Sequence, residues 1–205
     1  MYKLNMMRRA IGTAAIVLLF ATAAHAQQQG RIRGQVEKVD GATYVLKSRD
    51  GTTLNVKLAD DARVSALEKA SLADIKTDTF IGIAGMPKPD DNIEAFSIHI
   101  FLPAQRGVVP DRHGPWDARP NSTMTNAYVT SMVKEKDGEV LTVKYKDGEK
   151  KIFVPADTPI VVYAPGDKSD LKPGAKVFIV AIKQPDGTLQ ARTWRVGRDG
   201  VTPPM

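Results

Sequence analysis

Hydrophobic and polar residues alternate along most of the chain after about residue 30, a pattern that predicts short β-strands. In Leu54–Leu58 every second side chain is hydrophobic, so these side chains share one face of a strand. Leu141–Tyr145 has the same period. Between Tyr44–Lys47 and Leu54–Leu58 lies Asp50-Gly51, where glycine supplies the positive φ that a tight hairpin turn needs. These segments predict antiparallel hairpins.

The remaining elements follow in one order in each half of the chain. Ser65–Lys76 has hydrophobic residues near helical spacing, which predicts a short helix or helical turn capped by Ser65. The corresponding stretch of the second half contains Pro159, Pro165 and Gly166 and should be irregular. Further strands are predicted at Phe80–Gly85, Ile93–Phe101, Lys176–Ile182 and Thr188–Val196. Three strands, a short connector and two strands is typical of an OB-like five-stranded barrel, with a small β-sandwich as the second choice.

Turn residues recur at a fixed offset, which indicates an internal repeat. Asp40-Gly41, Asp50-Gly51 and Ala59-Asp60 return 97 residues later, and Asp74-Ile75-Lys76 and Ile93-Glu94-Ala95 have counterparts 96 residues later. The sequence therefore predicts an all-β protein of two tandem OB-like barrels. The predicted parts are a signal peptide (1–26), a short mature N-terminal stretch (27–30), a first barrel (31–104), a Pro/Trp-containing connector (105–126), a second barrel (127–197) and a tail (198–205).

The turn motifs of the second half resemble a known bacterial envelope family. Ser169-Asp170-Leu171-Lys172-Pro173-Gly174 and Asp186-Gly187-Thr188-Leu189-Gln190-Ala191-Arg192 are similar to the family catalogued as domain of unknown function 5666. The first half departs from these motifs, with Thr77-Asp78 in place of Pro-Gly and Asp91-Asn92 in place of Gly-Thr. The resemblance implies two tandem copies, an OB-like barrel and an envelope address, and it implies no catalytic residue.

The first 26 residues have the three parts of an export signal. Lys3, Arg8 and Arg9 form a basic start, Ile11–Ala23 is hydrophobic, and Ala24-His25-Ala26 has small residues where a signal peptidase cuts. We expect cleavage after Ala26, a soluble periplasmic mature protein and no membrane span in it, because the apolar run is shorter than a bilayer needs. The Arg8-Arg9 pair leaves the general secretory and twin-arginine routes both open. The chain has no cysteine, which excludes a lipid anchor on cysteine, disulfides and thiolate metal sites.

Charge and composition argue against nucleic acid binding and against catalysis. The net charge is +6 from 29 Lys and Arg and 23 Asp and Glu, and it falls to +3 without the three basic residues of the signal. Basic and acidic residues are mixed, as in Lys134-Glu135-Lys136-Asp137, and aromatic residues make up only 6%. No Gly-x-Ser-x-Gly motif and no phosphate-binding glycine loop occurs. We therefore expect a protein that is not an enzyme and needs no cofactor.

Two regions carry residues that could form a site. His99 lies between Ile98 and Ile100 and points away from their face, as a half-exposed strand residue or as part of an interaction site. In the connector, Trp116 should dock on hydrophobic surface. Three further connector residues could bind a divalent metal, or their acids could pair with Arg106, Arg112 or Arg119: they are Asp111, His113 and Asp117.

The sequence predicts an exported, non-enzymatic binding or assembly protein of the bacterial envelope, with an envelope protein or a glycan as partner. The alternative is a periplasmic divalent-metal-binding or metal-transport accessory protein that uses Asp111, His113 and Asp117, with His99 as a further candidate ligand. In either case the connector is the segment least like a simple spacer, because flexible linkers are usually rich in Gly and Ser and lack Trp. The site is therefore expected where the connector meets the first barrel.

Overall fold

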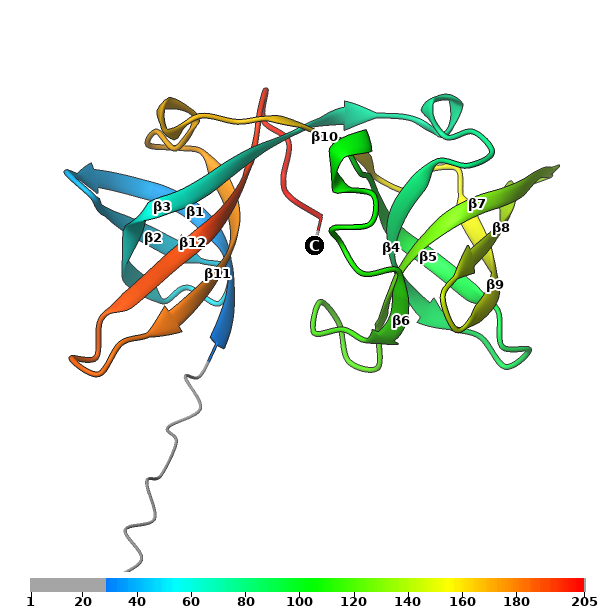
Figure 1. Ribbon diagram of the computed structural model, residues 1–205, viewed down its shortest axis with the longest axis horizontal. Coiled ribbons are helices and arrows are strands. Elements are labelled where there is room, and N and C mark those ends of the chain that lie inside the picture. Colours follow the sequence, from blue (N-terminus) through cyan, green and yellow to red (C-terminus); the bar gives the residue numbers. More distant parts are fainter. Residues whose placement is uncertain (1–28, 205) are drawn as a thin grey trace, which may run out of the picture.

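The computed structural model describes residues 29–204, so the predicted signal peptide at 1–26 lies outside the described residues. The described chain is all-β, with twelve strands and three short 3₁₀ helices (Figure 1). The strands are β1 (Gln29–Asp40), β2 (Thr43–Ser48), β3 (Thr53–Ala70), β4 (Phe80–Pro87), β5 (Ile93–Ile100), β6 (Arg112–Pro115), β7 (Thr123–Glu135), β8 (Gly138–Tyr145), β9 (Gly148–Pro155), β10 (Ile160–Pro165), β11 (Lys176–Lys183) and β12 (Leu189–Gly197). The helices are η1 (Leu72–Asp74), η2 (Pro103–Gln105) and η3 (Lys168–Asp170).

Five strands close a ring that we call ring A, in the order β1, β2, β3, β12, β11. Four of its pairings are antiparallel, and β3 pairs with β12 in parallel. The hydrophobic alternation of each strand points its apolar side chains into this ring, where they form one core. At its centre Trp194 is fully buried, donates its indole N–H to the Ala191 carbonyl at 3.1 Å and lies 4.9 Å from the ring of Tyr44. Burial of each such large side chain contributes about 1.5–3 kcal/mol.

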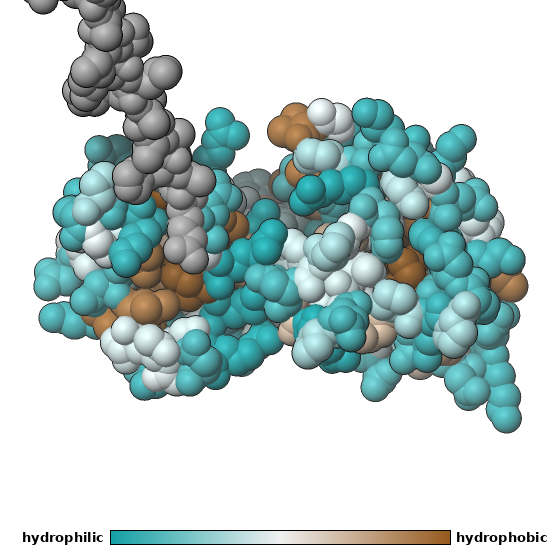
Figure 2. Space-filling view, turned by 90° about the horizontal axis from the view of Figure 1, so that it is seen from below, coloured by the Kyte–Doolittle hydropathy of each residue, from teal (hydrophilic) through white to brown (hydrophobic). Residues whose placement is uncertain are grey.

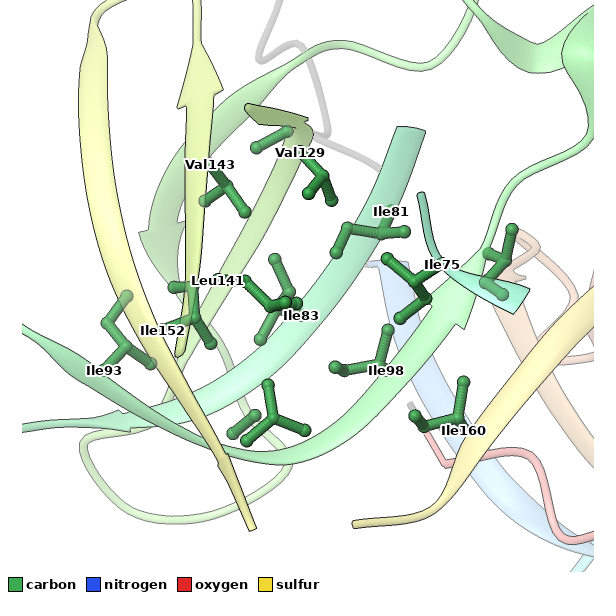
Figure 3. Close-up of a cluster of buried hydrophobic side chains, with 14 residues drawn as sticks. Ile75, Ile81, Ile83, Ile93, Ile98, Val129, Leu141, Val143, Ile152 and Ile160 are labelled. Atoms are coloured by element: carbon green, nitrogen blue, oxygen red, sulfur yellow. The ribbon is translucent and has the colours of Figure 1, made fainter. Parts of the chain in front are cut away.

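Five other strands close ring B, in the order β4, β5, β9, β8, β7. Again one pairing is parallel, between β5 and β9, and the other four are antiparallel. Isoleucine and valine side chains fill this ring, as Figure 3 shows for a cluster that includes Ile83, Ile98, Leu141 and Ile152. The two closed rings confirm the expected all-β class and five-stranded barrel.

The rings do not correspond to the two halves of the sequence. Strands β1–β3 close with β11 and β12 from the second half, and β7–β9 close with β4 and β5 from the first half. The prediction that residues 31–104 and 127–197 each form a barrel by themselves is therefore wrong. Each half contributes three strands to one ring and two to the other, an exchange of like elements of the kind seen in domain-swapped dimers.

The long strand β3 produces this exchange. Residues 59–62 contain no Pro or Gly to end the strand, so β3 continues through Ala70 and carries the chain from ring A to ring B (Figure 1). Strand β10 returns beside it, antiparallel, with Ala66 opposite Ala164 and Ala70 opposite Ile160. The short helix or helical turn predicted over Ser65–Lys76 is confirmed only in part. Ser65–Ala70 is strand, and a single 3₁₀ turn forms at Leu72–Asp74, with Ser71 rather than Ser65 at its N-cap.

The turn of the first hairpin falls at a different place in each half. In the first half Asp40 pairs with Thr43 across a two-residue turn, whereas in the second half Glu135 pairs with Gly138 across a two-residue turn that lies two positions earlier in the repeat. Gly41 therefore lies inside its turn, with a φ of 56°, and Gly138 lies in a strand. The Asp-Gly pairs that share an offset of 97 do not occupy equivalent places.

The connector and the C-terminal segment both lie between the rings. The connector includes β6, which pairs with β7, and the last described residues run into the same gap, where the Pro204 carbonyl accepts a hydrogen bond from Ser97 Oγ at 2.9 Å (Figure 1). Seen from below, the surface is mostly hydrophilic, with hydrophobic side chains in separate groups (Figure 2). No helix within residues 29–204 is long and apolar enough to cross a membrane.

Candidate functional site

A third group of buried side chains lies between ring A and ring B, and it is mainly aromatic. It includes Phe80 and Phe101 from the ring B side, Phe178 from ring A and Tyr163 from β10. Beside this group is a cavity of about 190 Å³, which we call the junction cavity. It is lined by His99, Phe101, Val109, Pro110, Arg112, Trp116, Met124, Asn126, Tyr163, Phe178 and Arg195.

On ring B, one cross-strand row forms the floor of the junction cavity. Gly82 on β4 pairs with Asn126 on β7 and with His99 on β5. Because position 82 has no side chain, the ring of His99 can lie over it, and a Cβ built at Gly82 would stand only 2.0 Å from His99 Nε2. The imidazole also meets Phe101 and Tyr163 edge to face, with centroids 4.7 and 5.6 Å away. Packing against these groups thus holds His99 in one position.

On the ring A side, Trp116 from the connector covers Phe178. The two ring centroids are 6.3 Å apart, and the guanidinium of Arg31 lies 4.4 Å from the Trp116 ring. Asp117 holds this arrangement by accepting a 2.7 Å hydrogen bond from Arg33 and pairing with Arg31 at 3.4 Å. Burial raises the pKa of the Asp117 carboxyl, but the Arg33 hydrogen bond and the two arginine charges outweigh it and lower that pKa. The connector is therefore docked, as the sequence predicts for Trp116.

Three buried polar atoms in residues 29–204 have no hydrogen-bond partner in the protein, and all three belong to side chains that line the junction cavity. They are His99 Nδ1, Trp116 Nε1 and Asn126 Oδ1. His99 is 3% exposed and Asn126 is 9% exposed. Leaving such an atom unsatisfied costs about 1–3 kcal/mol, and nearly all buried polar groups find a partner. Their concentration in one cavity points to a bound molecule as their partner.

Cations line the junction cavity without acids. Arg195 lies over Phe178 and Tyr163, 5.2 and 5.9 Å from their centroids, and Arg112 pairs with Asn126 across β6 and β7. None of the ion pairs within residues 29–204 involves either arginine, and no Asp or Glu lines the cavity. The cavity is therefore electropositive.

The two titratable rings of the junction cavity are neutral at pH 7. Burial, together with the charge of Arg195, lowers the pKa of His99 to about 3. Burial raises the pKa of Tyr163, although Arg195 opposes this effect. At neutral pH both side chains are therefore uncharged.

The structure separates the three residues predicted to bind a metal. Asp117 is paired with Arg31 and Arg33, whereas Nδ1 of His113, within β6, lies 2.8 Å from Oγ1 of Thr125 in β7. Within residues 29–204 no group of three or more His, Asp or Glu side chains is placed to hold a metal ion. The described residues therefore do not gather Asp111, His113 and Asp117 into a ligand group, and metal binding by these residues stays a prediction. The prediction that His99 is half-exposed is wrong. His99 is 3% exposed, and Tyr163 of β10 packs against its ring.

Sequence reasoning missed most of the junction cavity. Gly82, Asn126, Tyr163, Phe178 and Arg195 come from five strands, and no local pattern joins them. One signal was present: Gly82 interrupts a run of strand-forming residues, and a glycine inside a strand often marks the close approach of another group.

No protein-family model matches the chain, and neither a curated protein nor a solved structure is similar to it. The resemblance to the domain of unknown function 5666 therefore stays a prediction. The junction cavity is the feature from which function can be argued.

Proposed function

We propose that this chain is an exported, non-enzymatic binding protein of the bacterial envelope that holds a small ligand in the junction cavity. The observation that carries the proposal is the set of three unpartnered polar atoms, on His99, Trp116 and Asn126, around one cavity. Binding sites typically combine mainly apolar walls with a few placed polar groups, and this cavity has both. We also propose that each ring is an OB-like barrel built from both copies of a duplicated module. A fold of that kind does not by itself fix a function.

A binding role is favoured over catalysis by the chemistry of the lining. Among residues 29–204, the lining of the junction cavity contains no Ser, Cys, Thr, Lys, Asp or Glu, so no such nucleophile stands beside a base. His99 is the only base there, and its pKa of about 3 is far from the value near neutrality that general base catalysis favours.

The proposal is tested by filling the cavity. Mature protein (27–205) is incubated with the small-molecule fraction of a bacterial periplasmic extract and examined by native mass spectrometry. Val109 lines the cavity, whereas its neighbour Val108 is 73% exposed, so Val109→Trp and Val108→Trp form a matched pair. We expect a discrete bound mass on the wild type and on Val108→Trp that is absent from Val109→Trp. If the wild type and Val109→Trp carry the same masses, or if no mass is bound, the proposal fails.

The proposed export to the periplasm is tested by a separate experiment. Residues 1–26 are fused to a reporter enzyme that is active only after export, and Ala24 and Ala26 are both changed to bulky residues in a control fusion. We expect reporter activity and a shortened product from the first fusion, and uncleaved product from the second, because signal peptidase requires small residues there. A reporter that stays inactive would contradict the periplasmic assignment.

A further inference from the structure

The walls of the junction cavity limit the size and shape of what it can bind. A cavity of 150 Å³ lined by apolar side chains is known to hold benzene, so about 190 Å³ suits a body slightly larger than a single ring. The lining includes flat rings: Phe101 and Tyr163 are stacked with 7° between their planes, and Phe178 and Trp116 also line the cavity, with 30° between their planes. Stacked rings of this kind complement a planar molecule better than they complement a cluster of waters.

The positive charges that line the junction cavity favour a ligand with a negative charge. Arg195 is held over Phe178 and Tyr163, and Arg112 stands at the end of the row that contains Asn126 and His99. Within residues 29–204 neither arginine forms an ion pair, and no Asp or Glu of that part of the chain lines the cavity. The indole N–H of Trp116 adds an unpartnered neutral donor. These groups together complement a carboxylate, which only accepts hydrogen bonds.

The unpartnered oxygen of Asn126 requires a hydrogen-bond donor on the ligand. Asn126 Oδ1 is an acceptor without a donor, while the amide nitrogen of the same side chain donates to the Pro110 carbonyl at 3.2 Å, which fixes the orientation of the amide. A simple anion would leave this oxygen unsatisfied. A ligand with a hydroxyl or amino group besides its carboxylate would satisfy it.

We infer that the junction cavity binds a small planar carboxylate that also carries a hydrogen-bond donor, of about the size of a hydroxybenzoate. The carboxylate is bound by Arg195 and the Trp116 indole, the flat body lies among the aromatic rings, and the donor faces Asn126. This inference rests on the proposed function, since it names the ligand class of the same cavity.

Three probes of nearly equal size test the inference by calorimetry on the mature protein. They are 4-hydroxybenzoate, its neutral amide 4-hydroxybenzamide, and benzoate, which lacks the donor. We expect the hydroxy acid to bind at least roughly tenfold more tightly than the amide, since one charge-assisted hydrogen bond is worth at least that factor. We expect it to bind several-fold more tightly than benzoate, which lacks only the neutral hydrogen bond to Asn126. We also expect 4-hydroxybenzoate to shift the indole N–H resonance of Trp116 and to leave that of Trp194, in the core of ring A, in place.

Matched variants locate the bound carboxylate. Arg195→Met should weaken binding of 4-hydroxybenzoate roughly tenfold to hundredfold, and Arg192→Met, on the same strand but paired only with Asp61 on the surface, should not. Trp116→Phe keeps the ring and removes the donor, so it should weaken binding of the acid more than of the amide. Arg49→Met tests the basic hollow on the outside of ring A, where Lys47 and Lys176 also lie, and should have no effect.

The outcomes separate the two proposals. If the amide binds as tightly as the acid, or if Arg195→Met changes nothing, the carboxylate class is overturned while a small-molecule site remains. If Arg49→Met rather than Arg195→Met weakens binding, the anion binds on the outer surface and the inference is wrong. If no probe binds but Val109→Trp still removes a mass captured from extract, only the ligand class fails. If neither occurs, both proposals fail.

Discussion

His99 lies directly over Gly82, so that the space a Cβ would take at position 82 is filled by the imidazole. This contact fixes the floor of the junction cavity, because Gly82 pairs with both His99 and Asn126. Gly82→Ala must therefore displace His99. We expect it to lower the free energy of unfolding by about 1–3 kcal/mol, the usual cost of overpacking. Urea unfolding measures the loss.

A double variant at Gly82 and His99 tests whether the loss comes from the contact between these two residues. In the double variant Gly82→Ala/His99→Ala the clash is gone, so the two effects should not add, and they should differ from their sum by roughly 0.5–3 kcal/mol. Gly114→Ala, in strand β6, is the matched glycine, since a Cβ there meets nothing within 4 Å. Additive effects of Gly82→Ala and His99→Ala would contradict the contact.

How far the sequence predicts this site depends on the range of the contacts. It identified Trp116 and His99 as interaction residues, because an aromatic residue in a linker and a histidine in a strand are visible locally. It could not place Arg195 or Phe178 beside them, since that contact requires β11 and β12 to belong to ring A. It also assigned Asp117 to a metal, whereas Arg31 and Arg33, more than eighty residues earlier, pair with it.

The buried His99 makes the fold sensitive to acid. An unfolded chain binds a proton on this residue near pH 6.5, and the folded chain does so only near pH 3, because burial and then Arg195 disfavour the charged ring. The neutral form thus stabilises the fold fully above pH 6.5, and this contribution is lost as the pH falls from 6.5 towards 3. Between pH 7 and pH 5 the free energy of unfolding should drop by about 2 kcal/mol from this residue alone.

The comparison with His99→Gln isolates that contribution from other groups. His113 also has a lowered pKa, through burial and then Lys150, partly opposed by Asp91, and it acts in the same direction. Denaturant unfolding at pH 7 and pH 5 should give a smaller difference for His99→Gln than for the wild type, while His113→Gln should keep most of the difference. Equal pH dependence in the wild type and His99→Gln would show that His99 is not buried as a neutral ring.

Contacts of Arg198 join β3 and β10, the paired strands that run between the two rings, to the end of β12 in ring A. Arg198, just after β12, pairs with Glu68 on β3 at 2.8 Å and with Asp170 on η3 at 3.0 Å, and it donates to the Pro165 carbonyl of β10. These hydrogen bonds raise the pKa of Arg198, and those to Asp170 contribute most. Because one side chain joins three segments, Arg198→Met should lower the melting temperature measured by circular dichroism. Arg192→Met, which loses one exposed pair, should leave it unchanged.

The fold shows the same division between local and distant information. Strand positions such as Leu54–Leu58 and Leu141–Tyr145 were predicted correctly, because alternation is a property of a few neighbouring residues. The choice of ring was not, because each strand presents the same alternating face whichever copy closes on it. The segment Ser65–Ala70 was misread for a related reason. Ala66 and Leu67 point to opposite faces of β3 and both are fully buried, so the strand lacks the alternation that would identify it.

The exchange of strands can be tested with an introduced disulfide. Gln35 on β1 lies opposite Lys176 on β11, and both are exposed, so Gln35→Cys/Lys176→Cys places two cysteines at a distance that a disulfide can span. The natural chain has no cysteine to compete. A protease site inserted between Gly107 and Val108, in the exposed connector, then cuts the chain between its halves.

After oxidation and cutting, we expect one band of full size on a denaturing gel without reductant and two bands with it. Contiguous closure of each half would place β1 beside β4 instead, leaving the two cysteines in separate rings, and the cut chain would run as two bands in both lanes. Without the cysteines, the cut protein should still elute as one species under native conditions, because each half supplies two strands to the other's ring. If the cut halves separated on that column and each stayed folded, the exchange would be contradicted. With exchanged strands, neither half contains all five strands of a ring.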